Sequence, residues 1–575
     1  MESVLQIPTI KRILEDAEAK DIQRIASANR AQKLTVLSEL TSINERELMA
    51  IIAHGTGMHH LDKFSVDEHA AEKIPLRMLL RYQCIPLEAP EGYEGQTCMA
   101  TVWPVDDSTA QWMYAVMQRK LTFFLVLPEK LNAFLTERYG VGSESLDDPR
   151  MQALLDRREA KQEDEEDENA AIIKFVNEVV AQAMRDRATD IHFEPRKEKL
   201  QIRYRIDGRL VPVPVPKNLV AFQSAIISRI KIMARLNISE KRRPQDGRIT
   251  YGQGRDEVDV RVSTLPTMYG ESVSMRLLNE QSQPNSIRDL GFIDTDEAVI
   301  SKVLDLPHGI MLITGPTGSG KSTTLSAFMH KIGTPDRRVI TVEDPIEYEI
   351  PEINQTQVNH EIGLTFASAL RSVLRQDPDV IMVGEIRDRD TADIAVRASL
   401  TGHLVLSTLH TNDAPGAITR LIDMGIEPFL IASSVEMIIA QRLVRRLCQS
   451  CARKEMPDPK YLRSCLMALG LDSSEEQYAN GLKVPAGCED CRGLGYRGRI
   501  GMYEILRVDE NIHDLIYAEA SAREIRKRAM AHGMRSLQAC GWEHAKHGLT
   551  ALSEIMRYAD LSAEGDSAEK KEKVS

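Results

Sequence analysis

The chain has 575 residues, of which 42% are hydrophobic and 27% charged, and its formal net charge at pH 7 is −12. This length predicts about three or four domains, and the composition is that of a soluble protein with enough apolar residues for their cores. The negative charge argues against a protein that holds DNA by bulk electrostatics, although local basic patches stay compatible with it. The sequence has neither a run of eighteen apolar residues nor a signal-peptide pattern, so we expect a cytosolic protein that meets membranes only peripherally.

The first part of the chain mixes helical and strand-like segments. Apolar residues recur at helical spacing in residues 74–81 and 123–139, whereas 99–102 and 124–126 resemble short strands. This mixture predicts a small α+β domain over residues 1–145.

An acidic stretch separates this region from a second folded unit. Residues 146–169 end in a charge run without apolar periodicity, which is typical of a solvated linker. Residues 170–284 then combine a helical pattern at 172–184 with strand-like alternation at 200–206 and 258–262. Asp-Gly and Tyr-Gly pairs supply turn signals between the strands, so we expect a second α+β domain.

The third unit, residues 285–560, alternates strand-like and helical segments. This order is typical of βαβ units and predicts a parallel sheet covered by helices. The tail at 561–575 is strongly charged and almost free of apolar residues, and we expect it to be disordered. The candidate strands are apolar runs at 310–314, 339–342, 380–383 and 404–408.

A glycine-rich segment follows the first of these strands and has the P-loop pattern Gly-x4-Gly-Lys-Ser between a strand and a helix. Glycines permit the tight turn that directs successive backbone N–H groups at phosphates, and the helix N-terminus adds its positive dipole end. A glycine-rich turn without a ligand is the alternative, which the strand–loop–helix context disfavours. Lys321 should reach the β- and γ-phosphates, and the Ser322 hydroxyl should bind magnesium. The predicted nucleotide-binding residues here are Gly315, Pro316, Thr317, Gly318, Ser319, Gly320, Lys321, Ser322 and Thr323.

Two further strands end in acidic residues. The strand at 380–383 leads to Glu385, and the strand at 339–342 leads to Glu343 and to Asp344, which we assign to nucleotide binding. The carboxyl ends of parallel strands share one edge of a sheet, so these acids should converge where metal coordination and activation of water need them. Solvated strand ends are the alternative for each acid taken alone. Either Glu343 or Glu385 could be the general base.

Histidines and arginines could complete this site. His403 and His410 flank the strand at 404–408, and each is a candidate sensor of the γ-phosphate, with a satisfied core histidine as the equally open alternative. Arg261 and Arg276 lie on strand-like segments of the preceding domain. We predict a catalytic role for both arginines, because that domain could swing a guanidinium onto the phosphates; a solvated strand face is the alternative.

Four of the eight cysteines form two Cys-x-x-Cys pairs, within a predicted zinc element at 446–500. Two such pairs supply the four thiolates of a closed tetrahedral shell, which predicts a structural Zn²⁺ site. A redox role would need only one pair and is the alternative. The 36 residues between the pairs exceed the usual zinc-ribbon spacing, so they should form an excursion of their own. The predicted ligands are Cys448, Cys451, Cys488 and Cys491.

Residues 170–560 resemble the type II secretion and type IV pilus assembly ATPases of the secretion superfamily. Residues 1–145 resemble the family's N-terminal docking domain only weakly, and its cyclic-dinucleotide-binding motif is not recognisable there. The resemblance rests on residues 188–195, 203–208, 241–248 and 259–266, on the P-loop, and on 341–347, 375–388, 401–412, 424–429, 441–445 and 495–501.

The resemblance implies a RecA-like P-loop ATPase domain behind a PAS-like α+β domain and a docking domain. It further implies a homohexameric ring that uses ATP and Mg²⁺. From the cysteine pairs and the acidic charge we also expect the protein to carry Zn²⁺ and to bind no nucleic acid. Such a motor works at the cytoplasmic face of the inner membrane, through platform and docking proteins, to assemble a pilus or pseudopilus. In this family Arg261 and Arg276 would contact phosphates, and Arg371, Arg375 and Arg387 would serve ring contacts or charge stabilisation.

Three alternatives remain at this point. A pilus retraction motor shares the ATPase core, but such motors typically lack the tetracysteine insert and the long N-terminal region. A DNA-associated motor would grip DNA through the zinc element, which the acidic charge and the few aromatic residues near it disfavour. A scaffold that binds ATP without turnover is disfavoured by the intact lysine and carboxylates. The sequence does not separate secretion from pilus assembly.

Overall fold

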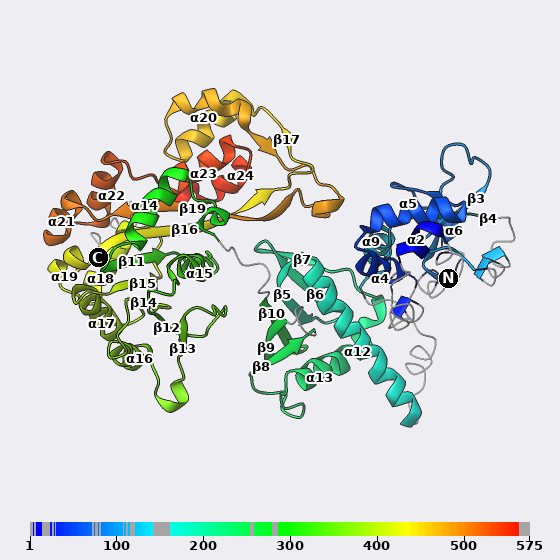
Figure 1. The fold of residues 1–575 in the computed structure, drawn as a ribbon, viewed down its shortest axis with the longest axis horizontal. Helices are drawn as coiled ribbons and strands as arrows, with labels where there is room; N and C mark the ends of the chain where they lie inside the picture. Colours follow the sequence, from blue (N-terminus) through cyan, green and yellow to red (C-terminus); the bar gives the residue numbers. More distant parts are fainter. Residues whose placement is uncertain are drawn as a thin grey trace. The chain divides into compact units, whose positions relative to one another are not determined.

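The computed structural model describes residues 7–13, 32–71, 82–106, 121–141, 162–252, 258–278 and 286–562, with short stretches and single residues between 4 and 114. The chain divides into two compact units, Met1–Leu278 and Asn279–Ser575 (Figure 1). The predicted linker before residue 162 and the predicted tail after residue 562 lie outside the described residues. Among the described residues, no helix combines the length and the apolar composition needed to cross a bilayer.

The N-terminal region is an α+β fold, as expected. Helix α5 is capped at both ends, by the Asn44 side chain, which accepts a hydrogen bond from Glu47 N, and by the left-handed Gly57. Leu37, Phe124 and Leu131 belong to its buried core. The sheet order is β1-β4-β3-β2. Its elements are α2 (Pro8–Ile13), α4 (Gln32–Thr41), α5 (Glu45–Thr56), β1 (His59–His60), α6 (Glu68–Ala71), β2 (Cys84–Leu87), β3 (Thr97–Thr101), β4 (Leu121–Leu125) and α9 (Pro128–Tyr139).

The two helices predicted in this region, at 74–81 and 123–139, have different outcomes. Most of the predicted helix at 74–81 lies outside the described residues. The predicted helix at 123–139 is wrong in its first part, because residues 121–125 form β4 and α9 begins only at Pro128. Proline fits the first helical turn, where its missing N–H would have no intrahelical partner.

The second part of this unit is a six-stranded antiparallel sheet with the order β7-β6-β5-β10-β9-β8. Phe175, Phe193, Ile230 and Val260 belong to one core shared by the sheet, α12 and α13. Asp207 and Gly208 both have positive φ, 48° and 84°, and form the predicted turn between β6 and β7. Its elements are α12 (Gln162–Arg185), β5 (Ala188–Pro195), β6 (Leu200–Ile206), β7 (Arg209–Pro212), η1 (Lys217–Phe222), α13 (Gln223–Met233), β8 (Gln245–Tyr251), β9 (Val258–Thr267) and β10 (Gly270–Leu278).

Helix α12 begins at Gln162, inside the segment interpreted as a linker. Glutamate and glutamine are good helix formers, and acidic residues stabilise the positive end of a helix. The charge run therefore extends the helix instead of remaining irregular up to residue 169. The domain boundaries otherwise stay predictions.

The C-terminal unit is built on a seven-stranded sheet with the order β13-β12-β14-β15-β11-β16-β19 (Figure 1). All neighbouring strands are parallel except β16 and β19. The four strands predicted from apolar runs are all present, since strands buried on both faces need continuous apolar sequence. The strands are β11 (Gly309–Thr314), β12 (Val339–Glu343), β13 (Asn354–Gln357), β14 (Val380–Val383), β15 (Leu404–Leu409), β16 (Val435–Leu447) and β19 (Tyr496–Arg507).

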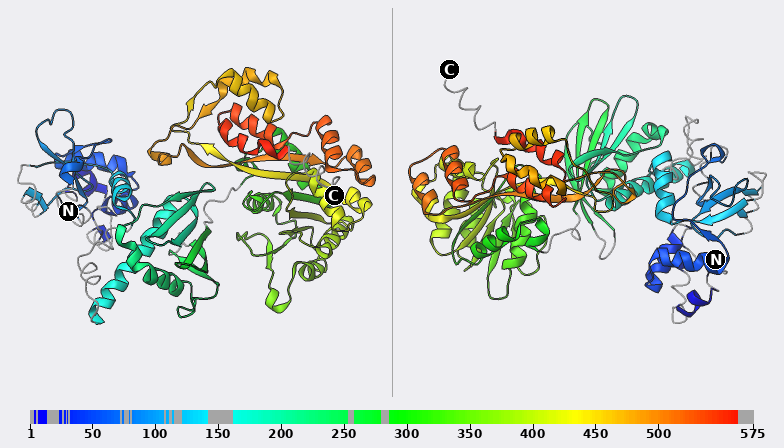
Figure 2. Two further views of the ribbon diagram at one scale, coloured as in Figure 1. Left: turned by 180° about the vertical axis from the view of Figure 1, so that it is seen from behind. Right: turned by 90° about the horizontal axis from the view of Figure 1, so that it is seen from above.

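Helices cover both faces of this sheet, which makes three layers (Figures 1 and 2). Successive residues of β11 alternate between two cores: Ile310 and Leu312 belong to one, Met311 and Ile313 to the other. The first core includes residues of α16 (Phe366–Val373), α17 (Arg389–Leu400), α18 (Pro415–Asp423), α19 (Pro428–Ser434), α21 (Glu510–Tyr517) and α22 (Ala522–Ala531). The second includes residues of η4 (Ile287–Leu290), α14 (Asp294–Leu304), α15 (Lys321–Ile332) and α23 (Leu537–Lys546).

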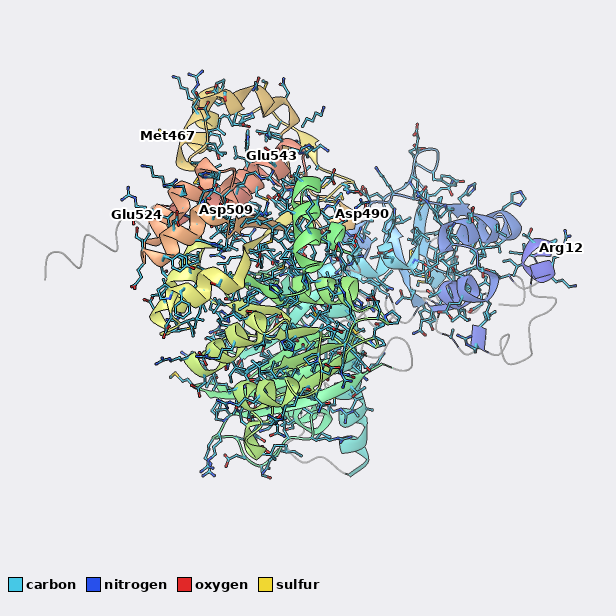
Figure 3. All side chains as sticks on the ribbon, turned by 60° about the vertical axis from the view of Figure 1, so that its left-hand side comes forward. Arg12, Met467, Asp490, Asp509, Glu524 and Glu543 are labelled. Carbon is cyan, nitrogen blue, oxygen red and sulfur yellow. The ribbon has the colours of Figure 1, made fainter. Side chains whose placement is uncertain are left out.

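The residues between the two cysteine pairs form the predicted excursion, which rises beside α23 in both views (Figure 2). Leu462 and Leu466 pack against Trp542 in a separate small core, while Met467 on the outer side is 78% exposed (Figure 3). The remaining elements are η5 (His360–Ile362), β17 (Arg453–Lys454), α20 (Pro459–Ala468), η6 (Ser473–Gly481), β18 (Lys483–Val484), η7 (Glu489–Cys491), α24 (Leu552–Ile555) and η8 (Met556–Ser562).

Candidate functional site

The P-loop joins the C-terminal end of β11 to the N-terminus of α15. Its glycines at 315, 318 and 320 have φ of 151°, 79° and 90°, which L side chains rarely adopt. A Cβ on Gly315 would lie 2.6 Å from the carbonyl oxygen of Gln441. Ser319 Oγ is buried and has no hydrogen-bond partner in the described part of the chain. The loop is therefore tightly seated on β16 and keeps a polar group without a protein partner, as a phosphate cradle requires.

Lys321 is folded back onto this loop. Its ammonium Nζ donates hydrogen bonds to the carbonyl oxygens of Gly315, at 2.7 Å, and Pro316, at 3.2 Å. The side chain is 9% exposed, and burial lowers its pKa to about 8, against the opposing charge of Glu385. Ser322 and Thr323 follow in the first turn of α15, with Ser322 exposed. A phosphate oxygen would replace the two carbonyls as the partner of Lys321.

Glu343 ends β12 at the same edge of the sheet. Its Oε1 accepts hydrogen bonds from Thr341 Oγ1, at 2.6 Å, and Gln355 Nε2, at 3.0 Å. Burial raises the pKa of Glu343, and these two hydrogen bonds oppose the rise. Asp344 follows, and its Oδ2 lies 3.5 Å from His360 Nε2. Glu343 is thus a partly buried carboxylate held through one of its two oxygens.

Glu385 follows the neighbouring strand β14. Gly384 N donates to Val342 O, which places the ends of β12 and β14 side by side. The carboxylate of Glu385 contacts the guanidinium of Arg387, and its Oε2 lies 3.1 Å from His410 Nε2. Its side chain is 15% exposed. The structure therefore brings both predicted carboxylates and His410 to the P-loop edge.

His403 lies at the other end of the sheet. It precedes β15, and its carbonyl accepts a hydrogen bond from the N–H of Gly309 at the start of β11. Its Nδ1 lies 2.9 Å from the carbonyl oxygen of Ala398. The full length of β11 therefore separates His403 from the P-loop, and the structure does not bring it together with the other predicted nucleotide-binding residues.

The predicted arginines of the N-terminal unit form a row across its second sheet. Arg261 lies opposite Arg276 in the pairing of β9 with β10, and opposite Arg248 in the pairing of β8 with β9. Arg276 Nε lies 3.2 Å from Asp190 Oδ1. Like charges directly opposite one another destabilise a sheet, so this row suits an anion. A pocket of about 470 Å³ is lined by Asp246, Gly247, Arg248, Arg261, Val262, Ser263, Ser274 and Arg276.

Sequence reasoning missed several residues of these sites. Arg248 stood only in a family motif, because its strand, β8, lacks the apolar alternation by which a half-buried strand is recognised. Gln441 and Arg442 of β16 also stood only in a family motif, with no role assigned to either. Gln441 Oε1 accepts from Thr324 Oγ1 at 2.9 Å, and the largely buried Arg442 donates from Nη2 to Asn412 O at 2.9 Å. Both follow an apolar run and carry no local signal of their role.

The four paired cysteines meet beyond the end of the β16–β19 ladder. Their sulfur atoms all lie within 4.8 Å of one another, with separations of 3.8, 3.7 and 3.7 Å for three of the pairs. A tetrahedral Zn²⁺ with Zn–S bonds of about 2.3 Å places its sulfur ligands roughly 3.8 Å apart. The N–H groups of Cys488 and Gly495 donate to Cys491 Sγ, each at 3.2 Å. The donor set and its spacing therefore fit zinc. The other four cysteines, Cys84, Cys98, Cys465 and Cys540, are buried.

Comparison with known proteins places both units in families. Residues 165–557 match the family described as "Type II/IV secretion system protein", and residues 54–145 match the MshEN domain. The second match assigns a family to a region in which the sequence alone showed only a weak resemblance.

Several curated relatives are similar over the same range. The "Type IV pilus assembly ATPase PilB" of Thermus thermophilus is 52% identical over 391 residues, which are 68% of this chain but only 43% of that protein. The "Type II secretion system protein E" of Pseudomonas aeruginosa is 48% identical over 393 residues, 68% of this chain and 76% of that protein. The "Type IV pilus assembly ATPase PilB" of Myxococcus xanthus is 36% identical over 563 residues, 96% of this chain and 97% of that protein.

Among solved structures, the ATPase DotB of Yersinia pseudotuberculosis has a TM-score of 0.50 at 20% identity, over 67% of this chain and 93% of that one. This likeness confirms the predicted fold of the ATPase core. The sequence relatives confirm the predicted resemblance to secretion and pilus assembly ATPases, and the three listed above are named for assembly or secretion. The chain belongs to the type II/IV secretion system protein family.

Proposed function

We propose that this chain is an ATPase that powers the assembly of a type IV pilus or of the corresponding fibre of type II secretion. The observation that carries the proposal is the convergence of a P-loop, a buried lysine and two carboxylates at one edge of a parallel sheet. The relatives support it, since they are named as pilus assembly ATPases and as a type II secretion protein.

The phosphates of ATP would bind the P-loop and Lys321. The N-terminus of α15 offers unpaired N–H groups and the positive end of the helix dipole. Lys321 exchanges its two carbonyl partners for phosphate oxygens, which also favour its charged form. Binding therefore changes the position of the Lys321 side chain. The loop, which packs against the carbonyl of Gln441, keeps its conformation.

Glu385 and Ser322 are the residues that would hold magnesium. The ion, when bound, neutralises charge on the β- and γ-phosphate oxygens. Arg387 and His410 both contact the carboxylate of Glu385, so its oxygens are already engaged. A carboxylate engaged in this way is a poor acceptor for a proton from water, and to hold magnesium it would exchange one of these two contacts for the ion.

Glu343 is better placed as the general base. Both of its hydrogen bonds reach Oε1, which leaves Oε2 to accept a proton from the attacking water. Burial raises its pKa, and a base is more effective as its pKa approaches the working pH. We therefore assign proton removal to Glu343 and magnesium orientation to Glu385.

The arginine row and the zinc cluster complete the proposed motor. Arg261 and Arg276 would stabilise charge on the phosphates from the N-terminal unit, and Arg248 would join them. Zinc bound by the four cysteines would fasten the base of the α20 excursion to the β16–β19 ladder and would take no part in hydrolysis. As in the resemblance, we propose a homohexamer at the cytoplasmic face of the inner membrane, bound to platform and docking proteins.

Phosphate release from ATP by the purified full-length chain tests the proposal. The wild type should turn over, Lys321→Ala should not, and Glu385→Gln should bind ATP but cleave it slowly. Lys302→Ala, which removes an exposed lysine on α14, serves as the control and should match the wild type. Wild-type turnover by Lys321→Ala would refute the assignment of the site.

A further inference from the structure

The loop at residues 410–414 contacts two parts of the proposed catalytic site, namely the carboxylate of Glu385 and the strand before the P-loop. At its start, His410 Nε2 lies 3.1 Å from Glu385 Oε2. The next residue, Thr411, donates from its N–H to Thr314 Oγ1 at 2.9 Å, and Thr314 immediately precedes the P-loop. The loop thus contacts both the carboxylate that orients magnesium and the strand that carries the phosphate cradle.

Two side chains from the C-terminal end of the sequence hold the other end of this loop. Glu504, on β19, accepts a hydrogen bond from Ala414 N through Oε1 at 3.0 Å. Arg526, on α22, donates from Nη1 to Glu504 Oε2 at 2.9 Å, and its Nη2 lies 2.8 Å from Asp413 Oδ2. Arg526 therefore bridges two carboxylates, one within the loop and one bound to its backbone.

The arrangement places charge in the interior. The Glu504 side chain is 1% exposed, and burial raises its pKa while Arg526 lowers it. Without Arg526, no guanidinium would lie between the carboxylates of Glu504 and Asp413, and their negative charges would repel each other. The loop would then rearrange or take up a proton, and either change disturbs the end that carries His410.

Helix α22 does not need Arg526 for its position. Ile525 and Ala529 bury the apolar face of the helix in the core, and Ser521 caps its N-terminus. Glu524, two residues before Arg526, lies on the outer face (Figure 3). Arg526 is thus a charged side chain directed inward from a helix that is already anchored by packing.

We propose that Arg526 and Glu504 are positioning residues for ATP hydrolysis. They hold the 410–414 loop so that His410 remains in contact with Glu385. This inference rests on the proposed function, and it makes the seating of α22 on the sheet a condition for fast turnover. Neither residue belongs to the P-loop, so ATP binding should be nearly independent of them.

Steady-state phosphate release and ATP binding by full-length variants test the inference. Arg526→Gln should lower kcat at least about tenfold, with KM for ATP within about twofold of wild type. Lys527→Gln removes one exposed positive charge from the same helix and should leave both unchanged. Arg526→Lys keeps a cation but cannot bridge both carboxylates, and should recover part of the loss.

A double-mutant cycle with His410→Ala separates positioning from general destabilisation. If Arg526 acts through His410, the double variant should be no slower than the slower single variant. Losses that multiply would overturn the inference, as would equal kcat values for Arg526→Gln and Lys527→Gln. If Arg526→Gln fails to fold, the same cycle made with Arg526→Lys decides. A wild-type chain that releases no phosphate would overturn the proposed function itself.

Discussion

Replacing Glu343 by glutamine separates the two carboxylates of the site. Glutamine has the same shape, and its carbonyl can still accept from Thr341 and Gln355, so the end of β12 should keep its structure. Loss of a general base lowers kcat by about 10²- to 10⁴-fold, which corresponds to a rise of about 2.7–5.5 kcal/mol in the barrier. ATP affinity should stay within about twofold of wild type, because the P-loop and Lys321 are untouched.

The same substitution makes a prediction about stability. Burial raises the pKa of Glu343 above its ordinary value of 4.5, so the ionised carboxylate destabilises the folded state at neutral pH. The amide carries no such penalty. The free energy of unfolding of Glu343→Gln should therefore equal or exceed that of wild type at pH 7, and the gain should vanish below pH 4.5, where both states of the wild type are protonated.

Phosphate release under saturating ATP, with nucleotide binding and thermal unfolding measured on the same preparations, checks both statements. Glu349→Gln, at an exposed position of the same segment, is the matched control and should retain wild-type kcat. A kcat for Glu343→Gln within about threefold of the control would refute the assignment of the base. A large rise in the magnesium concentration needed for turnover would instead give Glu343 the role assigned to Glu385.

Three further predictions concern other parts of the molecule. Burial lowers the pKa of Lys321 to about 8, and bound phosphate favours its ammonium form. ATP binding should therefore take up a proton, and the affinity for ATP should fall by up to about tenfold per pH unit above pH 8. Calorimetry in two buffers measures the proton uptake, and Lys321→Arg should abolish the pH dependence of the affinity. Cys451→Ser should lose zinc, present at about one equivalent per chain, and unfold at lower temperature, whereas Cys465→Ala, a buried thiol outside the cluster, should keep its zinc in metal analysis. Arg261→Ala should slow phosphate release at least about tenfold with an unchanged circular dichroism spectrum. Arg209→Ala, at an exposed position of the same sheet, should release phosphate at the wild-type rate. Equal rates for the two variants would exclude a catalytic role for Arg261.

The parallel sheet was the most predictable part of the molecule. The strand predicted at 380–383 has the observed bounds, and those at 310–314, 339–342 and 404–408 each gain one residue. Strands buried on both faces require unbroken apolar runs, which the sequence displays directly. The P-loop was predictable for a different reason, because its glycines and lysine serve one backbone geometry that few other residues permit.

Strand β8 and its arginine were harder to find. Its sequence, Gln-Asp-Gly-Arg-Ile-Thr-Tyr, has one buried residue, Ile249, and lacks the alternation that reveals a half-buried strand. Arg248 joins Arg261 only through the pairing of β8 with β9. Register across a sheet is a tertiary property, so a row of side chains from three strands leaves no local signature.

The contact between Glu504 and Ala414 was also beyond sequence reasoning, since 90 residues separate the partners. Nothing in the local pattern distinguishes Glu504 from other acidic residues on a strand. Its role follows from burial, and burial follows from the packing of α18 and α22 against the sheet. Charged residues that act inside a core are therefore the class of functional residue that a single sequence hides best.

The two histidines show where a stricter use of the sequence would have succeeded. His403 and His410 flank one strand and looked equivalent. The βαβ order already predicted that this strand runs parallel to β11, and ligands bind beyond the carboxyl ends of parallel strands. His410, which follows the strand, therefore lies at the P-loop edge, whereas His403, which precedes it, lies at the opposite edge. Chain direction alone therefore favours His410 as the residue near the nucleotide. The structure agrees with this rule, because His410 contacts Glu385 whereas His403 contacts the carbonyl oxygen of Ala398.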